Sequence, residues 1–185
     1  MARGMKIITA LLSAVFCGLF IWYYFVPSST LLAVLISVGV TLYHFAMRLL
    51  VGFVINLIFK NKIDYNLWWF RERKFEGCIY KLLRVRRWGK HIPTYSPDTF
   101  DKSKHTWQEI AMATAQAEIV HEVIIVFSLL SMLFIIPFGE PAVFIVTAVC
   151  ASLFDLIFVI MQRYNRPKLV RYIERLERKN KKDCE

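Results

Sequence analysis

The sequence predicts an all-α integral membrane protein with four transmembrane helices. Of the 185 residues, 57% are hydrophobic and only 21% are charged. The apolar residues are gathered in long blocks rather than dispersed as in a soluble core, and each block reaches the roughly 17 to 25 residues that a helix needs to cross a bilayer. The expected spans are about residues 7–26, 31–59, 110–138 and 141–161, within a single membrane domain that covers residues 1–185.

The positions of the basic residues predict the orientation. The net charge is +10, and apart from Arg48 the Lys and Arg side chains lie before the first span, in the central loop 60–107 and in the basic C-terminal tail 162–185. The short connections, at residues 27–30 and 138–141, contain none. By the positive-inside rule, both termini and the central loop are expected in the cytoplasm. The expected partners of these cations are membrane lipids with anionic headgroups, and nucleic acid is not expected.

The first span has no charged side chain and ends in aromatic rings at Trp22, Tyr23 and Tyr24. Such amphipathic rings are typical of the membrane interface. The span is therefore expected to be a lipid-facing anchor. After Pro27, residues 28–30 are available to cap the second helix.

Four residues of the second span are spaced by four, namely His44, Arg48, Gly52 and Asn56. This spacing lays them along one ridge of a helix. We take His44, Arg48 and Asn56 as candidate substrate-binding residues in a polar cavity. The alternative is that His44 and Arg48 only hydrogen-bond neighbouring helices, or that the Arg48 side chain extends to the cytoplasmic interface.

The central loop alternates aromatic and basic residues, as helices that lie in the headgroup plane do. Trp68, Trp69, Phe70 and Phe75 recur between cations. The sequence therefore predicts an interfacial amphipathic helical loop that roofs a site open to the inner leaflet. The alternative is a basic helix in solvent.

Three ionisable residues interrupt the third span: Glu118, His121 and Glu122. An aspartate at the centre of a membrane helix costs about 2.5 to 3.5 kcal/mol on insertion scales, so such residues are uncommon without a function or a partner. Spacings of three and four place them on one helical face. They are the candidate catalytic residues. The alternative is one buried salt bridge from this face to Arg48.

The fourth span contains Asp155 and continues into QRYNRPKL at residues 162–169. Two guanidinium groups and a carboxamide at the water interface are suited to holding a phosphate or pyrophosphate. The alternative is a positive-inside stop signal. This region adds five candidate substrate-binding residues: Asp155, Gln162, Arg163, Asn165 and Arg166.

Patterns typical of cofactor binding are missing from the sequence. It contains no P-loop, GxGxxG, HExxH or GxSxG motif, and its four cysteines form no CxxC pair. We therefore predict no cofactor and no metal.

Three motifs carry a family resemblance: YKLLRVRRWGKHIP at residues 80–93, AEIVHE at 117–122 and QRYNRPKL at 162–169. Together they resemble the glycosyl-4,4'-diaponeurosporenoate acyltransferase family, small bacterial membrane enzymes of staphyloxanthin-type carotenoid biosynthesis. The resemblance covers roughly the second half of the chain. It implies transfer of a fatty acyl chain to a sugar hydroxyl of a membrane lipid. The first motif adds Trp88 and Lys90 to the candidate substrate-binding residues.

The leading functional hypothesis is direct acyl transfer with His121 as general base on an acceptor hydroxyl. Glu118 or Glu122 would orient the imidazole. The acceptor is expected to be a glycolipid, and the donor an acyl thioester or a phospholipid. The site is expected near the cytoplasmic leaflet of a multi-pass protein of the cell membrane.

Two hypotheses from other classes stay open at this point. The first is a metal-dependent membrane lipid hydrolase with His44, Glu118, His121 and Glu122 as ligands, since imidazoles and carboxylates suit zinc or manganese. The second is a non-catalytic lipid-binding or assembly protein whose polar face pairs with another membrane protein.

Overall fold

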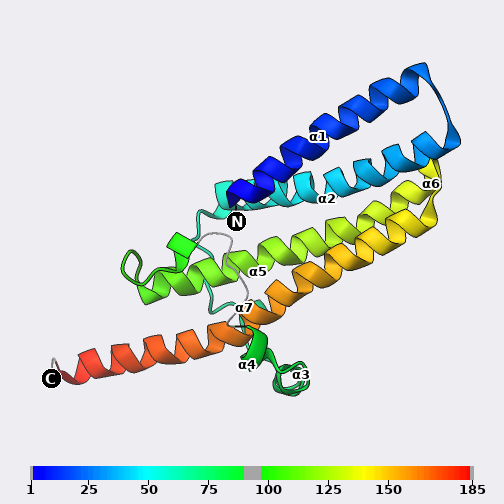
Figure 1. Cartoon of the computed structure of the whole chain (residues 1–185). Coiled ribbons are helices and arrows are strands. Elements are labelled where there is room, and N and C mark those ends of the chain that lie inside the picture. The colour runs from blue at the N-terminus through cyan, green and yellow to red at the C-terminus, as the bar shows by residue number, and fades with distance from the viewer. Residues whose placement is uncertain (1, 90–96, 184–185) are drawn as a thin grey trace. The chain divides into compact units, whose positions relative to one another are not determined.

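The computed structural model describes residues 2–89 and 97–183, and every regular element in these ranges is helical (Figure 1). The long helices are α1 (Ala2–Phe25), α2 (Ser29–Phe59), α5 (Trp107–Leu130) and α7 (Pro141–Asp183). The short ones are η1 (Trp68–Phe70), α3 (Glu76–Leu82), α4 (Val85–Trp88), η2 (Pro97–Phe100), η3 (Ser131–Phe134) and α6 (Ile135–Phe138).

Four helical stretches are long and apolar enough to cross a membrane: Arg3–Phe25, Ser29–Phe59, Trp107–Phe138 and Pro141–Lys182. The third joins α5, η3 and α6. The predicted all-α fold with four membrane-length helices is therefore confirmed by length and composition. The cytoplasmic placement of the termini stays a prediction.

The last helix is longer than the apolar span that forms its first part. The apolar span ends near Met161, but α7 continues through the basic segment to Asp183 and includes Pro167. Proline has no N–H to donate to the carbonyl one turn earlier, here that of Arg163. The helix nevertheless continues, because the residues after Pro167 are mostly Leu, Arg, Glu and Lys, which are good helix formers. The tail is thus part of the same helix as the fourth span.

The described part of the central loop contains several short helices. Between α2 and α5 the described residues form only the short helices η1, α3, α4 and η2. Arg84, with φ of +50°, adopts the left-handed conformation between α3 and α4 and so separates them. Its placement at the membrane interface stays a prediction.

Two short connections join the long helices. Ser28 caps α2, because its Oγ accepts a hydrogen bond of 3.1 Å from the Leu31 N–H, as expected for residues 28–30. Between α6 and α7 the chain reverses at Gly139, where φ is +68°. Glycine adopts this conformation without steric cost because it has no Cβ.

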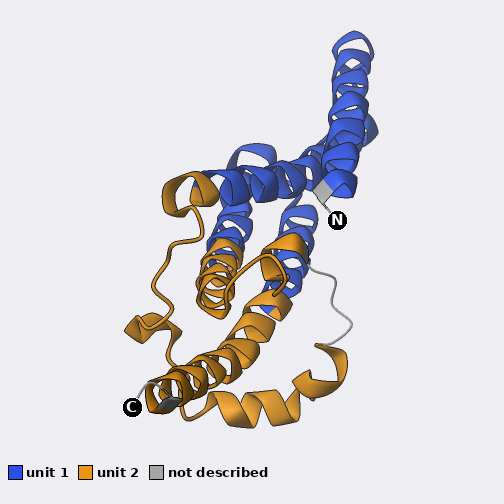
Figure 2. Ribbon diagram, turned by 90° about the vertical axis from the view of Figure 1, so that its left-hand side faces the viewer, with its two compact units in different colours: residues 1–54, 122–156 blue, residues 55–121, 157–185 orange. Residues whose placement is uncertain are grey.

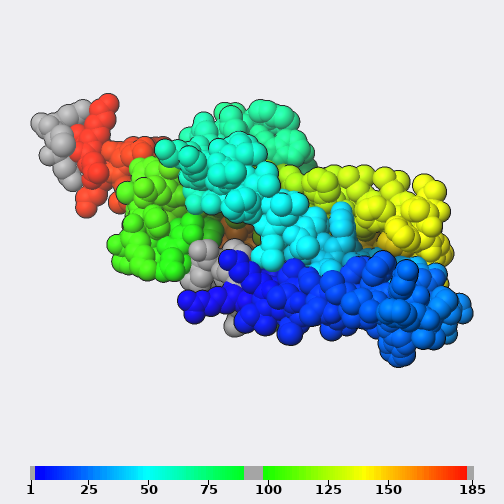
Figure 3. Space-filling view, turned by 90° about the horizontal axis from the view of Figure 1, so that it is seen from above, coloured from blue at the N-terminus to red at the C-terminus, as the bar shows by residue number. Residues whose placement is uncertain are grey.

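The chain divides into two compact units, Met1–Val54 with Glu122–Leu156 and Ile55–His121 with Ile157–Glu185 (Figure 2). Helices α2, α5 and α7 each contribute residues to both. In unit 1, α1 approaches α2 closely at Gly39, where an added Cβ would stand 2.9 Å from the Phe16 ring. The membrane-length window of α1 has no buried residue, and Figure 3 shows the helix in full view at the surface. This exposure suits the expected lipid-facing anchor.

The first half of α5 belongs to unit 2. Thr106 and Glu109 form a capping box there, in which Thr106 Oγ1 accepts from the Glu109 N–H (3.2 Å) and Glu109 Oε2 accepts from the Thr106 N–H (2.8 Å). The small side chain of Ala115 is fully buried against Ile63 and Phe70. Small residues let neighbouring segments approach the helix closely, which brings the loop against α5.

Candidate functional site

The central polar feature of unit 2 is a buried ion-pair network around Glu118. Its Oε1 accepts a hydrogen bond of 2.8 Å from Arg163 Nη1, and its Oε2 accepts one of 2.5 Å from Arg166 Nη2. The side chains of Glu118 and Arg166 are 0% and 1% exposed, and that of Arg163 is 16% exposed. A carboxylate with this little access to water requires such cationic partners, because an unpaired buried charge is strongly unfavourable.

A second carboxylate, Glu76 on α3, completes the network. Its Oε1 accepts from Arg163 Nε (3.0 Å) and Nη2 (2.7 Å), and its Oε2 accepts from the Tyr80 hydroxyl (2.8 Å). The arginine pair is thus matched by two carboxylates. Burial and the hydrogen bond to Glu76 raise the pKa of Tyr80 above its ordinary value, since both favour the neutral phenol.

Arg163 also fixes the backbone of the central loop. Its guanidinium donates to the carbonyl oxygens of Trp69 (3.3 Å) and Arg71 (3.4 Å). One side chain on α7 therefore connects α3, α5 and the end of η1. It can do so because the planar guanidinium offers five donors in a fixed geometry.

Arg166 makes a separate set of contacts within unit 2. Its Nη2 donates to the Thr114 carbonyl oxygen (3.0 Å), and its Nε donates to Thr114 Oγ1 (3.3 Å). Its guanidinium carbon lies 4.6 Å from the centre of the Phe70 ring. The guanidinium of Arg166 is therefore packed inside the protein, and its contact with a headgroup phosphate stays a prediction.

His121 lies on α5, three residues after Glu118, and is partly buried. Its ring stacks on that of Phe158, with 4.7 Å between centroids and 8° between planes. The stacking restricts rotation of the imidazole. A general base needs such a restricted orientation so that its nitrogen is aligned with the proton that it removes. Because both oxygens of Glu118 accept from arginines, its observed role is to anchor those arginines, and orientation of His121 by Glu118 stays a prediction.

Asn56 is also engaged within unit 2. Its Oδ1 accepts from Gln116 Nε2 (3.2 Å), and Gln116 Oε1 in turn accepts from the backbone N–H of Asn61 (2.7 Å). This contact secures the end of α2, where Asn61 has φ of +57°. The carboxamide thus has a structural partner at the position for which we predicted a substrate contact.

Unit 1 holds a second buried pair, between Arg48 and Asp155. Arg48 Nη2 lies 2.5 Å from Asp155 Oδ2, and the guanidinium also donates to the carbonyl oxygens of Ala151 (3.3 Å) and His44 (3.1 Å). His44 is 5% exposed, and its ring nitrogens have no hydrogen-bond partner among the described residues. Arg163 and Arg166 are the cations that pair with Glu118, and the alternative of a salt bridge from its helical face to Arg48 stays a prediction.

The remaining candidates occupy varied environments. Trp88 on α4 donates its indole N–H to the Leu83 carbonyl oxygen (2.8 Å). Gln162 is buried, Asn165 is exposed, and Glu122, which belongs to unit 1, is partly buried. Lys90 lies outside the described residues. None of these positions tests the proposed substrate contacts, which stay predictions.

The metal-site hypothesis finds no matching geometry in the described parts of the chain. Within residues 2–89 and 97–183, no three or more His, Cys, Asp or Glu side chains are grouped so that they could hold a metal ion. The four proposed ligands, His44, Glu118, His121 and Glu122, are all described and do not form such a group.

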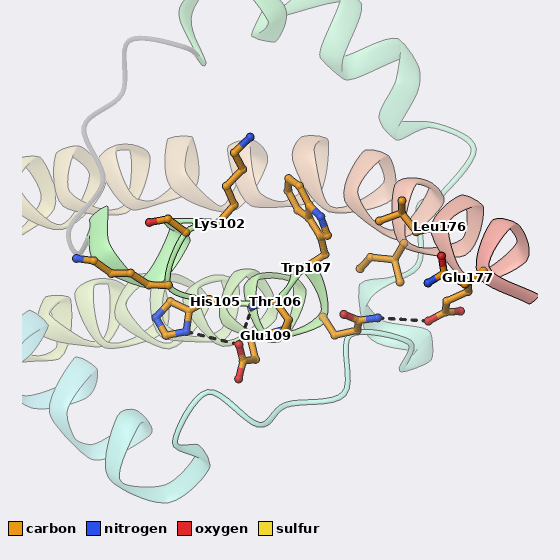
Figure 4. A pocket seen from close by; sticks show the side chains of 12 residues that line it. Lys102, His105, Thr106, Trp107, Glu109, Leu176 and Glu177 are labelled. Atoms are coloured by element: carbon orange, nitrogen blue, oxygen red, sulfur yellow. Dashed lines mark hydrogen bonds and ion pairs between the residues drawn. The ribbon is translucent and has the colours of Figure 1, made fainter. Parts of the chain in front are cut away.

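A hollow of about 570 Å³ in unit 2 lies where the start of α5 faces the end of α7 (Figure 4). Lys102, Trp107 and Leu176 contribute to its lining, together with the hydrogen-bonded pair of Gln108 and Glu177 (3.4 Å). None of the predicted site residues is among the described residues that line it. The hollow is therefore separate from the candidate catalytic residues.

Residues that sequence reasoning missed include Glu76, Tyr80 and Gln116. A signal for the first two is present in FEGCIYKLL at residues 75–83: Glu76 and Tyr80 are four apart on one face, while Phe75, Ile79 and Leu82 share another. Gln116 has no comparable signal, because its partners lie near the end of α2, distant in sequence.

One family model matches more than half of the chain. A family model described as glycosyl-4,4'-diaponeurosporenoate acyltransferase matches residues 66–175. That range includes Glu76, Glu118, His121, Arg163 and Arg166. Neither a curated protein nor a solved structure matches the chain.

Proposed function

This chain belongs to the glycosyl-4,4'-diaponeurosporenoate acyltransferase family and is a membrane acyltransferase, and from that premise we propose that His121 serves as the general base of the transfer. The acceptor is a hydroxyl group of a lipid-linked sugar. The acyl donor is a thioester or a phospholipid.

The observation that carries this proposal is the position of His121 in unit 2. It lies one helical turn from Glu118, the fully buried carboxylate of the ion-pair network, and its ring is stacked on Phe158. The network joins α5 to α7 and to α3 through Arg163. These ion pairs hold α5 against α7 and α3. His121 on α5 therefore has the fixed orientation that proton transfer needs.

In the proposed reaction, a ring nitrogen of His121 removes the proton of the acceptor hydroxyl as its oxygen attacks the donor carbonyl. The tetrahedral intermediate then collapses, the bond from carbonyl carbon to the leaving sulfur or oxygen breaks, and the proton passes to the leaving group. The products are the acylated glycolipid and the free thiol or lysophospholipid. No acyl-enzyme is required, because proton removal by a base is sufficient to activate a hydroxyl.

Arg163 is the better candidate of the two network arginines for a substrate contact. Its side chain is 16% exposed, whereas that of Arg166 is 1% exposed. A guanidinium stabilises negative charge that develops on a carbonyl oxygen or resides on a phosphate. We therefore assign this role to Arg163 and a structural role to Arg166.

The family description names the first acceptor to test, a glycosylated diaponeurosporenoate. We place the reaction at the cytoplasmic leaflet of a bacterial cell membrane, because the basic loop and tail are expected on that side. The non-catalytic assembly hypothesis assumes that the polar residues of the spans pair with another membrane protein. Arg48 pairs with Asp155 and Glu118 pairs with Arg163 inside one chain, so these residues do not require such a partner.

The test compares the purified full chain with His121→Gln in nanodiscs that contain the glycosylated carotenoid acid. Acyl thioester and phospholipid donors are supplied in separate reactions, and acylated product is measured by mass spectrometry. Loss of a general base is expected to lower the rate by about 10²- to 10⁴-fold.

The matched control is His105→Gln, a histidine in the exposed connection before α5. It should retain full activity. Full transfer by a folded His121→Gln protein would remove His121 from the mechanism while leaving family membership intact.

A further inference from the structure

Helix α3 presents its polar face to the protein and its apolar face outward. Glu76 is 5% exposed and accepts hydrogen bonds from Arg163 and from the Tyr80 hydroxyl. On another face, Phe75, Ile79 and Leu82 are 57%, 37% and 80% exposed. A surface helix of a soluble protein has the opposite arrangement, because burying apolar area is the main gain from packing it. The outward face of α3 therefore requires an apolar environment of its own.

The surroundings of this face are basic and aromatic. All seven Arg and Lys residues of the segment 66–89 are exposed, whereas of its two acidic residues Glu76 is buried. The indole side chains of Trp68 and Trp69 are 68% and 42% exposed. The exposed basic residues are Arg71, Arg73, Lys74, Lys81, Arg84, Arg86 and Arg87.

We propose that α3, together with Trp68 and Trp69, is a membrane-surface element that inserts into an anionic leaflet. Phe75, Ile79 and Leu82 lie among the acyl chains. The cations lie at the phosphates, since long basic side chains extend to headgroups while their stems stay apolar. The proposal depends on the exposure and charge of this segment and is independent of the role of His121.

A lipid surface suits this segment better than a soluble protein partner does. Tryptophan is enriched at the membrane interface, and cations adjacent to apolar side chains match anionic headgroups above acyl chains. The same chain has four helices of membrane length, so a bilayer is its expected environment.

The Glu76–Arg163–Glu118 contacts give this element a firm connection to the rest of unit 2. Arg163 holds α3 through Glu76, η1 through the Trp69 carbonyl oxygen, and α5 through Glu118. Insertion of the α3 face therefore fixes the depth of α3 and η1 relative to the bilayer surface. The ion pairs of Arg163 with Glu76 and Glu118 make this connection inside the protein. The exposed Arg and Lys residues of the segment take no part in these pairs.

The experiment uses the full chain with Cys17, Cys78, Cys150 and Cys184 replaced by Ser. A single cysteine is introduced by Leu82→Cys or, as the matched control, by Lys81→Cys. The two positions are neighbours but lie about 100° apart around the helix. Each is labelled with an environment-sensitive fluorophore in nanodiscs of phosphatidylcholine and phosphatidylglycerol, and quenching by spin-labelled lipid is compared with quenching by aqueous iodide.

Lipid quenching is expected to be several-fold stronger at position 82 than at position 81, and iodide quenching is expected to show the reverse order. In phosphatidylcholine nanodiscs without anionic lipid, lipid quenching at position 82 should fall. Strong iodide quenching at position 82 overturns the proposal, and so does weak quenching by both agents, which indicates a protein partner or a second copy of the chain. Equal lipid quenching in the two nanodisc types overturns the anionic preference.

Discussion

Arg166 and Glu118 form an ion pair from which water is excluded on both sides. The nitrogen Nη2 of Arg166 lies 2.5 Å from Oε2 of Glu118, and the two side chains are 1% and 0% exposed. The second oxygen of Glu118 accepts from Arg163. Buried pairs of this kind are not necessarily more stable than apolar packing, but removing one partner leaves an uncompensated charge.

Glu118→Gln is therefore expected to destabilise the protein strongly. Two guanidinium groups would lose their shared carboxylate, and breaking a buried pair by removing one partner costs about 3 to 5 kcal/mol. The measurement is thermal unfolding of the detergent-solubilised protein. The control is Glu174→Gln on the same helix as the arginines, since its partner Arg178 is 3.6 Å away and both side chains are exposed. An unfolding temperature unchanged in Glu118→Gln would contradict the anchoring role.

The Arg48–Asp155 pair in unit 1 predicts a non-additive mutant cycle. Arg48→Met and Asp155→Leu should each destabilise the protein, because each leaves the other charge buried without its partner. The double variant should be less destabilised than the sum of the two, with a coupling of about 0.5 to 3 kcal/mol. Unfolding temperatures of the four proteins measure this coupling. Simple additivity would mean that the two side chains do not depend on each other.

The raised pKa of Tyr80 predicts a pH dependence at the alkaline end. Burial and the hydrogen bond to Glu76 favour the neutral phenol in the folded protein. The stabilisation from this group is therefore complete below the ordinary tyrosine pKa of about 10, and it is lost as the pH rises through the higher pKa of the folded state. The ultraviolet absorbance of tyrosinate, recorded against pH, should lose its latest-titrating component in Tyr80→Phe. Loss of a component near the ordinary value instead would contradict the raised pKa.

Much of the fold follows from local sequence properties. The expected starts of the four spans lie within a few residues of the helix starts, at Ala2, Ser29, Trp107 and Pro141. The end of α7 could not be predicted from hydropathy, because the apolar run stops near Met161 while helix propensity continues to Asp183. Hydropathy indicates whether a segment lies in lipid or in water. The length of a helix also depends on the helix propensity of its residues.

The candidate site was predicted residue by residue but not as a set of contacts. The sequence singles out Glu118, Arg163 and Arg166, with Glu118 or Glu122 expected to orient His121 and the arginines to hold a phosphate, and these roles stay predictions. The structure adds contacts that were not predicted: Glu118 pairs with both arginines, and Glu76 is a second carboxylate at Arg163. A cost of burial can be read from one residue, but the group that compensates it cannot.

The sequence alone thus determined the number of membrane-length helices, the segregation of basic residues and the motifs that indicate an acyltransferase family, since these depend on composition and spacing along the chain. Only the tertiary structure decided that Glu118 pairs with Arg163, 45 residues away, and Arg48 with Asp155, 107 residues away. Spacing along a helix shows which side chains share a face. The rotation and packing of separate helices determine which charge that face meets.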